Sequence, residues 1–411
     1  MSSPSTPKGI TILLKYASSR ALNAGLVLLC TLISSIYLGA EKWGEIVLPQ
    51  TLMSVAVLLS LGVNEGMGNR IYLVGLSSRL ALSSAFVGVC VLFSLAFIGC
   101  LALIASLDLS KSFLFVPVGG LSASLFSQLR IYYRNIGQLS ELAKMYRYNS
   151  TSLVFSMPFV LYFSVPELFL LTLIFCQFSS YLLSMLKNDN YEMGVIGNYR
   201  RTFKVFLTYA YRGSPMILSW TVYNVIYFVE RFLIISDSKV ELALAAVSLT
   251  VIKGFSMCCS IVNTIFFNRV AVSVFEKKAS AVRKFFVRQV VVNGIIMSTL
   301  FSIAFIIFSS SIFIELAPSY SELITVFIWQ ATFLPVICIY LPLSSICNLT
   351  FGGGYIFRSL LIALLCYSTS IVLIVHVFGL ELFAEVYILG ALILLLSLLP
   401  AMRVFKADSS R

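Results

Sequence analysis

Ionisable side chains inside long apolar stretches are the residues of this sequence best suited to chemistry. A cation at the centre of a bilayer costs about 2.5–3.5 kcal/mol on insertion scales, so its side chain is expected to face protein or water. Arg231 and Lys253 lie within two successive apolar stretches, and Arg20 lies in the first one. Arginine binds phosphate through paired donors and lysine through a compact charge, so these residues predict an anion site. The alternative for Arg20 is that its side chain extends to the lipid headgroups.

Neutral polar residues continue the helix faces that carry these cations. Steps of three and four residues keep Lys253 on one helix face with Thr250, Ser256, Ser260 and Asn263. The stretch that holds Arg231 and the stretch that holds Arg20 carry similar polar stripes. From those two stripes the predicted substrate contacts are Asn23, Asn224 and Tyr227. Stripes on the first two helices of each half predict a central hydrophilic cavity.

Two glutamates accompany the cations. Glu65 ends the second apolar stretch and Glu230 directly precedes Arg231. Both are candidates for binding a coupling proton or cation, since a carboxylate in a span needs a partner. A purely structural alternative pairs Glu65 with Arg70, and Glu230 or Glu65 with the buried cations, so that the acids only join helices.

The segments that carry these residues have the composition and length of membrane spans. Hydrophobic residues make up 59% of the chain and charged residues 11%, whereas soluble domains have about 25% charged residues. About twelve stretches reach the length of roughly 20 residues that a span needs. The expected spans cover residues 14–38, 46–69, 80–106, 113–132, 149–166, 167–186, 206–236, 242–267, 290–314, 323–350, 359–379 and 386–402. The predicted fold class is an all-α polytopic membrane protein with two six-helix bundles.

Lys and Arg are distributed unevenly between the two sides of these spans. Of the 29 Lys and Arg residues, 23 lie on the side of the N-terminus and three on the other. The positive-inside rule then places both termini in the cytoplasm. The net charge of +12 is thus explained by topology and anionic lipids, not by nucleic acid. If the spans on either side of Pro166 were one span, the C-terminal half would have the opposite orientation and its cations would face outward. The charge bias therefore favours two spans there.

A polar segment near the middle divides the chain. Residues 1–186 are expected to form the N-terminal six-helix bundle, 187–205 a cytoplasmic linker, and 206–411 the C-terminal six-helix bundle. Six spans in each half give both halves the same orientation. This predicts a repeat about an axis along the membrane normal, as in two-bundle transporters.

Catalytic, metal and cofactor motifs are not found in the sequence. The nine cysteines lie in or beside apolar spans without metal-ligand spacing. The glycine run at 352–354 lacks the Lys-Ser/Thr of a nucleotide-binding loop. We therefore expect no catalytic residue, no metal and no cofactor, and transport driven by an ion gradient or by the substrate gradient.

Four segments resemble a known family. Residues 34–44 resemble the LGPxxYG outer turn of polysaccharide flippases, and residues 61–68 resemble the glycine-rich end of their second helix. Residues 229–235 resemble their xDRFxIG segment, and 265–270 the end of their eighth helix. Together with the span layout, the sequence resembles the Wzx-type O-antigen flippases of the multidrug/oligosaccharidyl-lipid/polysaccharide (MOP) exporter superfamily. It departs from the family pattern at Tyr37, where many members have Arg, and at Glu230, where many have Asp.

The resemblance implies a flippase in a bacterial inner membrane. Its substrate would be an undecaprenyl-diphosphate-linked oligosaccharide, moved from the cytoplasmic to the periplasmic leaflet by alternating access. Its partners would be this lipid-linked oligosaccharide, membrane lipids and other O-antigen assembly proteins. Two alternatives stay open. A multidrug or cation exporter of the same superfamily should have an acidic, aromatic cavity, and a membrane-embedded O-antigen polymerase usually has a large outer loop.

Overall fold

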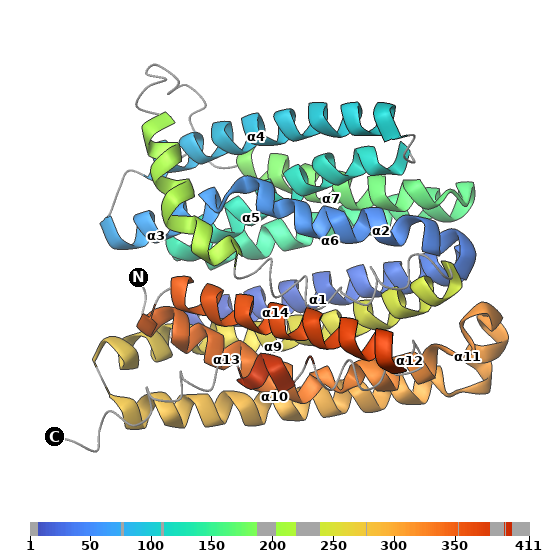
Figure 1. Cartoon of the computed structure of the whole chain (residues 1–411). Coiled ribbons are helices and arrows are strands. Elements are labelled where there is room, and N and C mark those ends of the chain that lie inside the picture. The colour runs from blue at the N-terminus through green and yellow to red at the C-terminus, as the bar shows by residue number, and fades with distance from the viewer. Residues whose placement is uncertain are drawn as a thin grey trace. The chain divides into compact units, whose positions relative to one another are not determined.

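A computed structural model describes residues 7–74, 78–107, 111–186, 203–218, 239–276, 278–351, 353–378, 390 and 392–396. These residues are helical apart from short turns, and they include no strand (Figure 1). The all-α prediction is confirmed for this part of the chain. Seven of the described helices are long and apolar enough to cross a membrane, and an eighth span results if one bent pair is counted as a single span.

The chain divides into two compact units, residues 1–221 and 222–411. In the first unit the helices are α1 (Pro7–Leu38), α2 (Ala40–Ala56), η1 (Val57–Ser60), α3 (Val63–Val74), α4 (Ser78–Leu107), η2 (Lys111–Leu114), α5 (Phe115–Asn135), α6 (Leu139–Phe163) and α7 (Pro166–Leu186), followed by a helical segment at 203–218. In the second unit they are α9 (Lys239–Phe275), α10 (Ala279–Phe308), α11 (Ser311–Leu316), η3 (Pro318–Tyr320), α12 (Leu323–Ala331), α13 (Phe333–Phe351) and α14 (Gly353–Phe378).

The helical segment at 203–218 packs within the first unit, although the sequence predicted the second bundle to begin at residue 206. Gly213 lies against the backbone of Gly62, and Gly66 lies against the backbone of Tyr209. Helix backbones approach this closely only where small residues such as glycine place no side chain between them. The division between the two units therefore falls at residue 221, later than the linker expected at 187–205. Residues 187–202 of that linker lie outside the described part.

The second predicted span, 46–69, is broken between η1 and α3. Leu61 and Gly62 have φ angles of 50° and 74°, which interrupt the helix. Glycine adopts positive φ without the steric penalty of a side chain, so the break is stable at Gly62. The break turns α3 into a separate short helix, and α3 is the helix that carries Glu65.

The corner predicted at Pro166 is confirmed. α6 ends at Phe163, Ser164 has a φ of 54°, and α7 begins at Pro166. However, α6 begins at Leu139, ten residues before the predicted start of the fifth span. Its first turns are polar and include a 2.8 Å ion pair between Glu141 and Lys144. Hydropathy alone does not identify such polar turns as part of a helix, although the pair stabilises them.

The core of the first unit lies between α1, α3, α4, α5, α6, α7 and the segment at 203–218. Tyr16, Met67, Leu129, Tyr132 and Tyr146 are among its buried side chains. The most extensive helix contacts join α1 to α6, α6 to α7, α5 to α7 and α2 to α5. α5 is therefore central to this unit and positions residues on more than one of its faces.

The second unit is built around α9. This helix packs against α10, α12 and α13, and Gln330 Nε2 of α12 donates a 3.2 Å hydrogen bond to Ala245 O of α9. α12 and α13 bend by 44° at residue 332. Pro335 explains the bend, because proline has no N–H to donate to the carbonyl of Ala331.

Candidate functional site

The predicted site residues fall in different parts of the structure. Arg20, Asn23 and Glu65 belong to the first unit, and Lys253 belongs to the second. The other four lie outside the described residues and stay predictions: Asn224, Tyr227, Glu230 and Arg231.

Arg20 of α1 is half-buried and faces other polar groups of its unit. Its Nη1 donates a 2.8 Å hydrogen bond to the hydroxyl oxygen of Tyr16, one helical turn earlier. Tyr16 is only 2% exposed, and its ring lies 6.2 Å from that of Tyr146 on α6. The guanidinium is thus held by Tyr16, whose ring in turn lies beside that of Tyr146.

Two further arginines come from the last turns of α5. Arg130 and Arg134 are one turn apart, so they share a helix face, and both are exposed. Arg134 lies within electrostatic range of Arg130, Arg20, Tyr16 and Tyr146. Arg130 also donates a 3.0 Å hydrogen bond to Ser127 Oγ. The sequence analysis counted both arginines only as cations of a cytoplasmic loop, and their four-residue spacing was the signal that it missed.

Glu65 of α3 faces this arginine pair. The half-buried carboxylate interacts electrostatically with Arg130 and Arg134, but no ion pair shorter than 4 Å joins it to either one. Its buried Oε2 has no hydrogen-bond partner within the described part of the chain. We call Arg20, Arg130 and Arg134, together with Glu65, the basic cluster.

α3 is fixed beside α5 by a buried hydrogen bond. Asn64, which is 1% exposed, donates from Nδ2 to the backbone oxygen of Ser124 over 2.8 Å. On α5, Gln128 reaches in another direction and donates to Leu82 O of α4 over 3.1 Å. These bonds join α3 and α4 to α5, so Glu65 is fixed beside the helix that carries Arg130 and Arg134.

Asn23 has a structural role in this arrangement. Its Oδ1 accepts a 2.8 Å hydrogen bond from Asn149 Nδ2 and a 3.2 Å hydrogen bond from Ser150 Oγ, both on α6. The oxygen therefore joins α1 to α6. Substrate contact by Asn23 stays a prediction, and it would involve the amide nitrogen more readily than this occupied oxygen.

Lys253 lies half-buried on α9, in the predicted polar stripe. Two hydroxyls of that stripe are bonded to their own helix: Thr250 Oγ1 donates to Ala246 O over 2.8 Å, and Ser256 Oγ donates to Lys253 O over 2.8 Å. Asn263 keeps a buried Oδ1 without a hydrogen-bond partner in the described residues. The stripe exists as a helix face, and its role in substrate binding stays a prediction.

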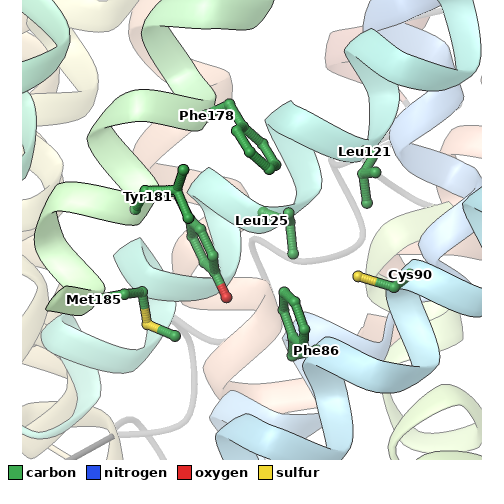
Figure 2. Close-up of a pocket in the computed structure, with 8 residues that line it drawn as sticks. Phe86, Cys90, Leu121, Leu125, Phe178, Tyr181 and Met185 are labelled. Atoms are coloured by element: carbon green, nitrogen blue, oxygen red, sulfur yellow. The ribbon is translucent and has the colours of Figure 1, made fainter. Parts of the chain in front are cut away.

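A cavity of about 140 Å³ lies between α4, α5 and α7 of the first unit (Figure 2). Its lining is apolar except for the hydroxyl of Tyr181, and the Phe86 and Tyr181 rings stack with centroids 6.1 Å apart. Leu121 and Leu125 of α5 face it. At 100° per residue, this pair and the arginine pair lie on opposite faces of α5. The cavity cannot recognise a charged headgroup, so we assign the candidate site to the basic cluster.

Solved structures with a similar fold include transporters in different conformations. An outward-facing multidrug resistance MATE family transporter of the MOP superfamily matches with a TM-score of 0.68 and 13% identity, over 96% of each chain. The inward-facing conformation of such a transporter matches with a TM-score of 0.65, also at 13% identity and over 96% of each chain. The chain shares the fold of these transporters.

A third match with this fold is a MOP superfamily transporter from Pyrococcus furiosus. Its TM-score is 0.67 at 13% identity, over 97% of this chain and 96% of the other, and it is described as having a binding pocket of reversed polarity that suggests a different function. No protein-family model matches the sequence, and no curated protein matches it significantly. The fold of these multi-pass transporters agrees with the seven described helices that are long and apolar enough to cross a membrane.

Proposed function

We propose that this protein is a flippase for a prenyl-diphosphate-linked oligosaccharide, such as an O-antigen repeat unit carried by undecaprenyl diphosphate. The single observation that carries the proposal is the basic cluster, in which Arg134 interacts electrostatically with Arg20 and Arg130, and Glu65 with Arg130 and Arg134. Guanidinium groups bind phosphate through two parallel N–H donors, and several of them together match the charge of a diphosphate. Tyr16 and Tyr146 add aromatic surface beside them.

The depth of the cluster supports this role. Arg20 lies 18 residues before Leu38, the end of α1, which corresponds to about 27 Å along the helix. Arg130 lies 15 residues after Phe115, the start of α5, or about 22 Å. With the expected cytoplasmic N-terminus, both lie near the inner boundary of a hydrocarbon core about 30 Å thick. A lipid headgroup entering from the cytoplasmic leaflet would meet the arginines there.

Transport would proceed by alternating access. The fold neighbours are described in inward-facing and outward-facing conformations. The headgroup would bind the basic cluster from the inside and be released on the outside, while the prenyl chain stays in the lipid. Crossing the hydrocarbon unassisted is prohibitive for an anionic, hydroxylated headgroup. Lys253 and Arg231 remain candidates for a second set of contacts, and Glu65 and Glu230 for coupling to an ion.

The proposal is tested with purified protein in proteoliposomes. A fluorescent prenyl-diphosphate N-acetylglucosamine is added, and its translocation is followed by quenching of the label in the outer leaflet. Arg20→Ala and Arg134→Ala should each slow translocation at least tenfold, because each removes a charge-assisted contact to phosphate. The matched control is Arg147→Ala, an exposed arginine of α6 that is not among the charges acting on Arg134. Wild-type rates in both cluster variants would refute the site.

A multidrug exporter is the second candidate function, and the multidrug resistance transporters among the fold neighbours favour it. An organic cation would require acidic residues at its site. The basic cluster instead has three cations for one acid. Efflux of ethidium from cells that express the protein, lost on Glu65→Gln, would favour this second function over the flippase.

A further inference from the structure

The formal charge of the basic cluster is set by Glu65. Three guanidinium groups and one carboxylate give these described residues a charge of +2. Among the described residues, no ion pair within 4 Å joins this carboxylate to Arg130 or Arg134. Its field therefore acts on whatever anion the arginines bind.

The backbone around Glu65 is held in place by contacts of its two neighbouring residues. Asn64 fastens the same turn of α3 to Ser124 of α5 through the 2.8 Å hydrogen bond. The next residue, Gly66, lies against the backbone of Tyr209, where a side chain larger than hydrogen would collide. These contacts fix the backbone of Glu65 beside α5, so its carboxylate stays within reach of the arginines, as a charge that discriminates between ligands must.

Two prenyl diphosphates differ in charge by one unit. A diphosphate that links a prenyl chain to a sugar is a diester, and it has two ionised oxygens and a charge of about −2. A prenyl diphosphate without a sugar is a monoester, whose terminal phosphate ionises again with a pKa of about 6, so its charge approaches −3 at pH 8. Arginines alone attract the more highly charged monoester more strongly, so selectivity toward the diester needs a negative charge beside them.

We propose that Glu65 is a specificity residue that shifts the basic cluster toward glycosylated diphosphate diesters and away from bare diphosphate monoesters. This inference rests on the proposed function and adds to it a reason for an acid at an anion site. Repulsion by Glu65 grows with ligand charge, so it penalises the monoester more than the diester. The preference for the diester, defined as the ratio of its affinity to that of the monoester, is therefore higher with Glu65 than without it.

The experiment uses two ligands that share one prenyl chain. Farnesyl diphosphate and its glucosyl diester are titrated at pH 8 into the full-length protein in detergent, and dissociation constants are measured by microscale thermophoresis. The variants are Glu65→Gln, which removes the charge, and Glu65→Asp, which keeps it. The control is Glu141→Gln, which removes a carboxylate that pairs with Lys144 on α6.

At partly solvated separations, one unit charge changes the affinity by about threefold for each charge on the ligand. Glu65→Gln should therefore tighten binding of the diester about tenfold and of the monoester about thirtyfold, so the preference for the diester falls about threefold. Glu65→Asp and Glu141→Gln should both keep the wild-type preference. Thermal unfolding of each variant confirms that it is folded.

Equal affinity changes for the two ligands, or none, in a folded Glu65→Gln variant would overturn the inference. That failure differs from failure of the proposed function. If Arg134→Ala loses affinity for the diester while Glu65→Gln changes nothing, the flippase site stands and the specificity role does not. If neither the wild type nor Glu65→Gln binds the diester, both proposals fail together.

Discussion

The two faces of α5 differ in what they can bind. One face carries Arg130 and Arg134 and adjoins Arg20 and Glu65. The other carries Leu121 and Leu125 and closes a cavity of about 140 Å³. The cavity is the hollow part, yet its lining offers no charge to a headgroup. The difference teaches that a candidate site for an anion is marked by converging charges and not by the size of an empty space.

The largest effect is expected from reversing a charge on the basic face. Arg134→Glu replaces a cation by an anion beside Glu65 and should weaken binding of the glucosyl farnesyl diphosphate diester at least a hundredfold. Because Arg134 is exposed, the thermal unfolding temperature should change little. Titration by microscale thermophoresis measures the affinity. Retention of binding within threefold would remove Arg134 from the site.

The next largest effect is expected on the apolar face. Leu125 is 1% exposed, and Leu125→Ala enlarges the cavity and should reduce the free energy of unfolding by about 2–3 kcal/mol. The affinity of the folded protein for the diester should stay the same. Chemical denaturation in mixed micelles measures the first quantity. A double variant with Arg134→Glu should show additive effects, and strong coupling between them would contradict the independence of the two faces.

A smaller effect is expected at the junction of α3 and α5. Asn64→Ala removes the hydrogen bond to Ser124 O and should cost about 1–2 kcal/mol of unfolding free energy, since the amide is buried. It should also lessen the preference for the diester, because Glu65 would no longer be fixed beside the arginines. The same two ligands measure that preference. A loss of stability without any loss of preference would show that Asn64 does not position Glu65.

The smallest effect is expected from a charge outside the cluster. Lys144→Ala breaks the exposed pair with Glu141 on α6 and should change the unfolding free energy by less than about 1 kcal/mol. Diester affinity should remain within twofold of wild type. A larger loss of affinity would mean that general positive charge, and not the basic cluster, attracts the ligand.

The apolar spans were predictable because each carries its own signal. The corner at Pro166 follows from a proline that cannot continue a helix and from the charge bias. The break at Gly62 was not predicted, because a glycine inside an apolar run is equally compatible with a continuous helix. The early start of α6 was also missed, since its first turns are polar.

The candidate site was predictable only in part. Arg20 and Glu65 stood out because they interrupt apolar stretches. Arg130 and Arg134 did not stand out, because cations near the end of a span also fix its orientation in the membrane. Nothing in the adjacent sequence distinguishes that role from ligand binding. Asn23 was expected to contact substrate, whereas its oxygen accepts hydrogen bonds from Asn149 and Ser150, 126 and 127 residues away along the chain.

Local properties of the chain, namely apolar length, charge bias and helix-breaking residues, were enough to establish an all-helical membrane protein and the ionisable residues within its spans. They act over one or two helical turns, so they leave open which helices become neighbours. The meeting of Arg20, Arg130, Arg134 and Glu65 from α1, α5 and α3 depends on long-range packing around α5. That packing is governed by contacts such as Asn64 with Ser124 and Gly66 with Tyr209, whose partners lie far apart in sequence.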